Sequence, residues 1–184
     1  MNTAFAYSAT GYIDYGMLGA AQIDNHGNVN STMLGNDFNA PERRFPGSGG
    51  GNQVLSYCWK TIVVMKHEPR RFVERVDFIT SPGYINGYNS REELGLPANT
   101  GPWKVVTSKA LFGFDRESRK LKLEGILMGQ SIEGVLAGIG FLQPLVDRNV
   151  KVLSPPNEKE LELLRNDIDP SRTIISGDML RVEA

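Results

Sequence analysis

The sequence predicts an α/β protein with an open, mixed and largely parallel sheet and flanking helices. Apolar, β-branched runs alternate with short helical patterns through the first half of the chain, and a hairpin pattern follows in the second half. The 184 residues suit one compact domain, and we expect residues 1–184 to form it.

The first strand is expected at Gly16 to Ile23, where the run GMLGAAQI is short and apolar. Such a run is typical of a strand buried on both faces, so it predicts a position in the middle of the sheet. Gly27 and its Asp and Asn neighbours offer turn chemistry directly after it. A loop over 46–52, a short helix from Val54 to Trp59 and a β-branched strand from Thr61 to Met65 are expected next.

A further strand is predicted from Val76 to Thr80, because the Ser-Pro-Gly run that follows would end it. Many Gly, Asn and Pro residues with little periodicity make Tyr84 to Pro102 a long surface excursion. Three strands should follow at Val105–Thr107, Ala110–Phe114 and Lys120–Ile126, with 115–118 as a hairpin turn.

Two helices are expected in the last third of the chain. Ser131 is a suitable N-cap for a helix that runs to about Ala137 and is closed by Gly138 or Gly140. Asn157 and Glu160 have the spacing of a capping box, which predicts a helix over 158–167 that Asp169-Pro170 stops.

Composition excludes several classes of function. A net charge of −1 with 22% charged residues gives no reason to expect nucleic-acid binding. No apolar run approaches the roughly 20 residues of a membrane span. The single cysteine, Cys58, favours a cytoplasmic, reducing location and a buried structural role. His26 and His67 lack the spacing of a metal site, so no metal is expected.

The feature that stands out is a glycine cluster between an extended segment and a helix. Its members are Gly47, Gly49, Gly50 and Gly51. Glycines let backbone N–H groups approach a ligand closely, which can make a cradle for an anion or an oxyanion. The cluster has none of the P-loop, dinucleotide-binding or nucleophile-elbow patterns, and a plain tight loop is the equal alternative.

Basic residues flank the cluster on both sides. They are Arg43 and Arg44 before it, and Lys66, His67, Arg70 and Arg71 after the next strand. We favour a charged surface that is solvated or faces another subunit, and a site for phosphate groups is the alternative.

Several motifs in order resemble those of one enzyme family. They are GAAQID (19–24), GNVNST (27–32), RFPGSGGGN (44–52), TIVVMKHEPRRFVERVDFITSPG (61–83) and LGLP (94–97), with IDP at 168–170. The chain resembles the B subunit of the glutaconate CoA-transferase type, within the family I CoA-transferases.

This resemblance implies an enzyme in which A and B subunits pair around the active site. A B-subunit glutamate attacks the acyl-CoA there, and its thioester with CoA is the central intermediate. The resemblance makes the backbone of Gly49 and Gly50 the expected oxyanion donors. It implies contacts to CoA or the acyl group by Gly47, Ser48, Gly51, Asn30 and Arg44. Coenzyme A is then a substrate, and no bound cofactor is expected.

The sequence departs from the family pattern at its beginning. Eighteen residues precede Gly19, whereas about a third of the subunit precedes this motif in the family. The nucleophilic glutamate therefore has no counterpart in this chain, because Glu42, Glu68 and Glu74 match other parts of the pattern.

Three explanations of this departure stay open. A separate N-terminal polypeptide could complete a transferase, the scaffold could serve a CoA-thioester hydrolase or decarboxylase, or the chain could be truncated and inactive. A non-catalytic structural subunit is the alternative from a different class. A domain without the opening strands would leave a sheet edge uncovered, so we expect an A-subunit-like partner in a hetero-oligomer.

Overall fold

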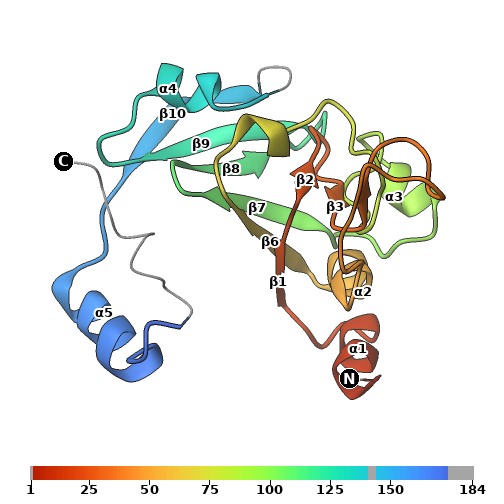
Figure 1. Cartoon of the computed structure of the whole chain (residues 1–184), viewed down its shortest axis with the longest axis horizontal. Coiled ribbons are helices and arrows are strands. Elements are labelled where there is room, and N and C mark those ends of the chain that lie inside the picture. The colour runs from red at the N-terminus through yellow and green to blue at the C-terminus, as the bar shows by residue number, and fades with distance from the viewer. Residues whose placement is uncertain (1, 141–143, 174–184) are drawn as a thin grey trace. The chain divides into compact units, whose positions relative to one another are not determined.

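The computed structural model describes residues 2–140 and 144–173 (Figure 1). The chain divides into two compact units, Met1–Leu153 and Ser154–Ala184, so one domain over 1–184 stays a prediction. Among the described residues, no helix is long and apolar enough to cross a membrane.

The first unit is built on a six-stranded mixed sheet with the order β1-β6-β7-β8-β9-β10. Three neighbouring pairs are parallel, β1 with β6, β6 with β7 and β9 with β10, and the other two are antiparallel. The strands are β1 (Tyr15–Gly19), β6 (Lys60–Met65), β7 (Pro102–Thr107), β8 (Ala110–Phe114), β9 (Leu121–Leu127) and β10 (Leu145–Leu153).

Two short antiparallel pairs and several short helices complete the fold. The pairs are β2 (Gln22–Ile23) with β3 (Val29–Asn30), and β4 (Met33–Leu34) with β5 (Arg43–Arg44). The helices are α1 (Asn2–Ala9), α2 (Gly51–Tyr57), the 3₁₀ turn η1 (Pro69–Arg71), α3 (Ser90–Glu93) and α4 (Ile132–Ala137). The second unit holds α5 (Glu158–Leu163) and the π-helical segment η2 (Leu164–Ile168).

The core lies on one face of the sheet. Alternate residues of the strands point to this face, among them Val63, Val105 and Phe112, and each is fully buried. Leu55 of α2 and Ile23 of β2 pack into the same cluster. Helix α2 runs antiparallel to β1, because Gly16 lies against Val54 and Cys58 while Gly51 lies against Leu18. The beginning of α2 is therefore near the end of β1.

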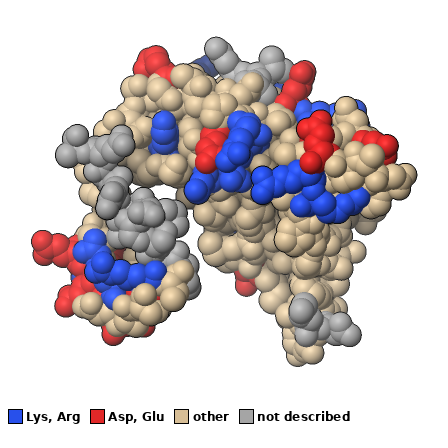
Figure 2. Space-filling view, in the orientation of Figure 1, with Lys and Arg blue, Asp and Glu red and all other residues tan. Residues whose placement is uncertain are grey.

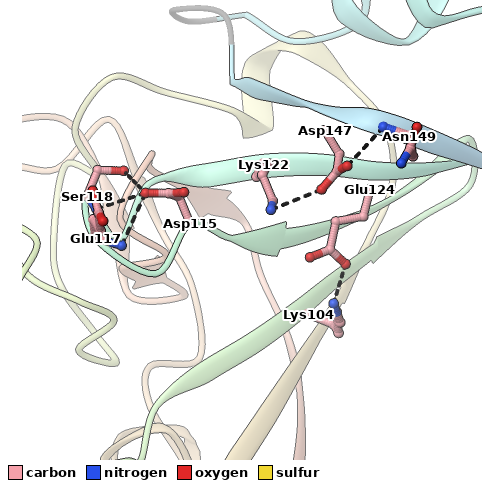
Figure 3. A network of polar contacts seen from close by, with 8 residues as sticks. All are labelled: Lys104, Asp115, Glu117, Ser118, Lys122, Glu124, Asp147 and Asn149. Atoms are coloured by element: carbon pink, nitrogen blue, oxygen red, sulfur yellow. Dashed lines mark hydrogen bonds and ion pairs between the residues drawn. The ribbon is translucent and has the colours of Figure 1, made fainter.

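The opposite face of the sheet, here called the outer face, carries exposed apolar side chains and ion pairs. Met17 is 69% exposed, Val64 45% and Val106 37%. Lys104 pairs with Glu124, and Lys122 lies 3.0 Å from Asp147 (Figure 3). Such partly exposed pairs add little to stability, so they do not replace the burial that stabilises the inner face.

Most predicted elements are confirmed. The structure contains the predicted loop, helix and strand that follow residue 46. It also contains the three strands predicted between Val105 and Ile126 and the hairpin turn that joins two of them. Ser131 accepts a hydrogen bond from Gly134 N at 3.0 Å, and the capping box of Asn157 and Glu160 is present. The 158–167 helix continues past α5 as η2.

The central position predicted for Gly16–Ile23 is wrong. Within this chain β1 is an edge strand that ends at Gly19, and the next residues turn into β2. Tyr15 and Met17 are exposed because no element of the described chain covers their face. The apolar run had suggested burial on both faces, but only Gly16 and Leu18 face the core.

One other prediction is also wrong, and several elements were missed. Residues 76–80 form no strand, although Ser81 bridges Val29. The excursion from Tyr84 to Pro102 is confirmed as mostly exposed and irregular chain, although it contains α3 and a fully buried Arg91. Helix α1 and strand β10 had no prediction, since neither segment has strong apolar periodicity. The short elements β3, β4, β5, η1 and α3 had none either, because two to four residues are too few to show a period.

Candidate functional site

The glycine cluster forms the loop that leads into α2. Gly47 N donates to Ser31 O at 3.1 Å, and Ser31 Oγ donates back to Gly47 O at 3.0 Å. Gly51 N donates to Ser48 O at 2.6 Å, which closes a tight turn over 48–51. Gly47 has φ +96° and Gly49 has φ +48°, so both use conformations that glycine adopts without strain. We call residues 47–51 the glycine loop.

The N–H groups of Gly49 and Gly50 are free donors of this loop, as is that of Ser48. None of these N–H groups makes a hydrogen bond within the described part of the chain, whereas those of Gly47 and Gly51 do. Gly49 is exposed, and Gly50 is half-buried beneath the ring of Phe5. Two unpaired, neighbouring N–H groups are what an oxyanion site requires.

Asn30 supports the glycine loop through hydrogen bonds within the protein, and its side chain is not free to bind a ligand. It is fully buried, and its Nδ2 donates to Gln22 Oε1 at 2.7 Å and to Met33 O at 2.6 Å. Its Oδ1 accepts from Thr32 N at 3.0 Å. These bonds fix the segment whose Ser31 holds Gly47, so both ends of the amide are used within the protein.

Among the flanking arginines, Arg44 lies apart from the other three. Arg44 is exposed, donates to Phe38 O and stacks over the Phe38 ring at 4.6 Å. Arg43, Arg70 and Arg71 instead line one cavity of about 250 Å³ beside Gln22. Figure 2 shows a row of Lys and Arg side chains on one face, with acidic side chains beside it.

Glu68 partly neutralises this cavity. Its Oε2 accepts from Arg70 Nε at 2.9 Å and from Arg71 Nε at 3.0 Å, and these bonds lower the pKa of Glu68. Three guanidinium groups against one carboxylate still leave an excess of positive charge. The cavity can therefore accept an anionic group.

His67 is not an acid or base of this site. Its ring is buried, with Nε2 2.9 Å from Val135 O and Nδ1 3.0 Å from Thr107 Oγ1. Because the carbonyl oxygen can only accept, Nε2 carries the proton in the neutral ring. The single hydroxyl proton of Thr107 has two acceptors in reach, His67 Nδ1 and Ala110 O at 3.1 Å. Burial lowers the pKa of His67, which favours this neutral form.

Acidification is expected to weaken the fold through His67. Since its folded pKa lies below the unfolded value, its stabilising contribution is complete above about pH 6.5 and is lost as the pH falls through the folded pKa. Melting temperatures measured at about pH 7.5 and about pH 5.5 should fall more in the wild type than in His67→Gln. An equal fall in both proteins would contradict this assignment.

The cysteine is also structural. Cys58 is 1% exposed behind β1, and burial raises the pKa of its thiol. A raised pKa disfavours the thiolate that nucleophilic attack needs. The structure thus confirms the buried role expected for Cys58. Within residues 2–140 and 144–173, no three His, Cys, Asp or Glu side chains are grouped to hold a metal ion.

Sequence reasoning missed Arg91, which holds the far end of α2. Its Nη2 donates to Leu55 O at 3.1 Å and to Ser56 O at 3.0 Å. Its Nη1 donates at 2.7 Å to both Pro82 O and Gly83 O. Burial lowers the pKa of Arg91. No signal within the segment marks this arginine, because its acceptors are backbone carbonyls distant in sequence.

Known proteins share this architecture and sequence. The family model described as coenzyme A transferase matches residues 2–138. The B subunit of glutaconate CoA-transferase from Acidaminococcus fermentans is 42% identical over 158 residues, covering 86% of this chain and 58% of the relative. The B subunit of 3-oxoadipate CoA-transferase from Pseudomonas knackmussii is 36% identical over 155 residues, covering 84% and 58%.

The solved structure of the Acidaminococcus fermentans glutaconate coenzyme A-transferase superposes with a TM-score of 0.82 at 42% identity. The match covers 88% of this chain and 60% of that one, which confirms the predicted fold class. The chain spans about three fifths of the length of these relatives. Over that length its fold, its motif order and its sequence all agree with theirs, and the chain belongs to the coenzyme A transferase family.

Proposed function

We propose that this chain is part of a B-type subunit of a heteromeric enzyme that moves coenzyme A between carboxylic acids. The observation that carries the proposal is the pair of unpaired N–H groups on Gly49 and Gly50 in a glycine loop of this family. In this proposal residues 1–184 act as one domain of the B type, and the single cysteine favours the cytoplasm.

The glycine loop would act when a carboxylate attacks the thioester carbonyl of an acyl-CoA. That carbonyl oxygen gains negative charge as the new bond forms, and two N–H donors already in place stabilise it without reorganisation. As the carbon–sulfur bond breaks, the acyl group joins the glutamate in a mixed anhydride and CoA leaves as its thiolate. Attack of this thiolate on the glutamyl carbonyl then gives the glutamyl-CoA thioester and releases the first acid, after which CoA passes to a second acid. The glutamate itself belongs to another segment or chain.

The cavity lined by Arg43, Arg70 and Arg71 supports the proposal that CoA binds near this loop. The strand segment from Arg43 to Gly47 runs alongside residues 31–34, and a rise of about 3.3 Å per residue separates its ends by about 13 Å. CoA carries its phosphates on a long pantetheine arm, so its phosphate and thioester sites should lie apart. We assign the phosphate contacts to Arg43, Arg70 and Arg71, with Ser48 and Arg44 at the edge.

An A-subunit-like partner fits the open side of the sheet. Edge strand β1 and the exposed Met17, Val64 and Val106 of the outer face would aggregate unless another polypeptide covered them. The hetero-oligomer is therefore part of the proposal.

The reaction class is tested on the chain purified together with its natural partner polypeptides. After addition of an acyl-CoA and acetate, mass spectrometry should find a CoA adduct on a glutamate of a partner. Release of free CoA, of CO₂ or of a ring-opened acid without an adduct would instead identify a hydrolase or decarboxylase. No turnover with any partner would favour a structural role for the chain.

The oxyanion role of Gly50 has a sharper test. A side chain at position 50 would collide with Phe5, so both test proteins carry Phe5→Ala. In that background Gly50→Ala keeps the N–H group of residue 50, and Gly50→Pro removes it. The φ of Gly50 is −95°, which is not far from the range that proline adopts. We expect kcat to be about 10²–10³ lower with proline than with alanine. Equal kcat values in two well-folded variants would overturn the assignment.

A further inference from the structure

A second cavity lies at the other end of α2 from the glycine loop. Its volume is about 380 Å³, and it opens where β6 and β7 begin, around Lys60, Gly101 and Pro102. The glycine loop precedes Gly51, whereas this cavity follows Tyr57 and Cys58. Helix α2 separates the two by about 10 Å of helix length.

Positive charge gathers at this cavity. Lys60, Arg116 and Arg119 line it, and Glu92 is the acid among its lining residues. None of the three cations forms an ion pair with an acidic side chain in the part of the chain that the structure describes. The guanidinium of Arg119 lies over the ring of Tyr84 at 5.0 Å, and its Nε is buried without a hydrogen-bond acceptor. A buried donor without an acceptor is costly unless a ligand satisfies it.

Exposed aromatic rings accompany the cations. The chain has two tryptophans, Trp59 and Trp103, and both line this cavity with exposures of 45% and 39%. Tyr88 is 67% exposed at the same place. Lys60 Nζ lies 4.9 Å from the centre of the Trp103 ring. Flat rings beside unpaired cations are suited to stack a planar group and bind its charged substituent.

Strained backbone marks the same cavity. Tyr88 has φ +27°, Asn99 has φ +61° and Arg119 has φ +56°, and all three line it. Only Ile85 and Arg172 share this left-handed conformation among the other non-glycine residues that the structure describes. Such strain persists where the surrounding structure enforces it, and it is concentrated at binding sites.

We propose that this cavity binds a nucleoside diphosphate, with its base stacked on Trp103 or Tyr88 and its phosphates held by Lys60, Arg116 and Arg119. The ligand can be a free nucleotide or the nucleotide end of CoA. Only the second source rests on the proposed transferase function.

The tryptophans report on this site directly, because both lie in it. Titration of the full 184-residue chain with ADP should quench its tryptophan fluorescence to saturation. Adenosine lacks the phosphates and inorganic tripolyphosphate lacks the ring, so each should bind at least about tenfold more weakly than ADP. No saturable change with ADP, or equal binding of tripolyphosphate, would overturn the proposal.

Two cavity variants and one control variant test whether the change in tryptophan fluorescence comes from ADP bound in the cavity. Arg116→Gln changes an exposed turn residue, and Arg119→Asn places at φ +56° a residue that tolerates this conformation. Each should weaken ADP binding about tenfold, while Arg148→Gln, at an exposed arginine of β10, should leave it unchanged. Equal affinity in all of these well-folded variants would also overturn the proposal.

Competition identifies the source of the nucleotide. If CoA displaces ADP, the cavity takes the nucleotide end of the substrate, and the assignment of the CoA phosphates to Arg43, Arg70 and Arg71 is overturned. If CoA binds and ADP stays, the cavity is a separate nucleotide site. Loss of ADP binding in a glycine-loop variant, with Arg116→Gln unaffected, would place ADP at the loop and exclude the cavity.

Discussion

Replacing Arg91 with leucine is expected to destabilise the chain by about 4 kcal/mol or more. The guanidinium is 1% exposed and donates five hydrogen bonds, one of them to Thr100 Oγ1 at 2.9 Å. Leucine would remove the donor from the carbonyl oxygens of Leu55, Pro82 and Gly83, whereas Ser56 O also accepts from the Thr100 hydroxyl at 3.0 Å. Each buried carbonyl left without a donor costs roughly 1–3 kcal/mol. Urea unfolding followed by circular dichroism measures the loss.

Two further variants serve as comparisons for the free energy of unfolding of Arg91→Leu. Arg91→Lys keeps a positive charge but cannot reach all the acceptors, so we expect an intermediate loss. Arg75→Leu removes an exposed arginine, and its effect should stay within about 0.5 kcal/mol. An Arg91→Leu variant as stable as Arg75→Leu would show that the buried hydrogen bonds contribute nothing net.

The second large effect is expected at Gly83, where alanine should cost about 3 kcal/mol. A Cβ atom there would overlap the backbone carbonyl of Gly27 and the N–H of Asn28. Backbone cannot move aside as the end of a side chain can, so the turn over 24–28 must shift. Asn28 Oδ1 would then lose its bond from Gly83 N, now 2.9 Å long.

Gly19→Ala is the control for this substitution. A Cβ at Gly19 meets no atom within 4 Å, and its φ is not in the left-handed region. Its thermal unfolding should match that of the wild type, while Gly83→Ala melts well below it. Equal melting temperatures for the two variants would contradict the close approach of the two loops.

Local patterns were enough to predict the elements that depend on local interactions. The capping box at Asn157, the N-cap at Ser131 and the hairpin around 115–118 each involve residues close in sequence. The glycine loop was also predictable, because a cluster of glycines interrupts regular structure directly before the apolar helix segment.

Properties that depend on distant contacts could not be predicted. The edge position of β1 follows from which strands pair with it, and an apolar run does not specify its neighbours. The burial of Arg91 depends on carbonyls of residues 55, 56, 82 and 83. The meeting of Arg43 with Arg70 and Arg71 depends on how β5 and η1 approach each other.

The order of strands in the sheet also has a consequence for how the protein matures. Strands β7, β8 and β9 are joined by short connections and form local contacts, which should fold early. Tyr15 pairs with Lys60 across a long crossover that contains the glycine loop, so this edge closes late. Amide hydrogen exchange should therefore be faster at β1 than at β7, β8 and β9. The glycine loop should therefore take its final shape only when β1 joins the sheet.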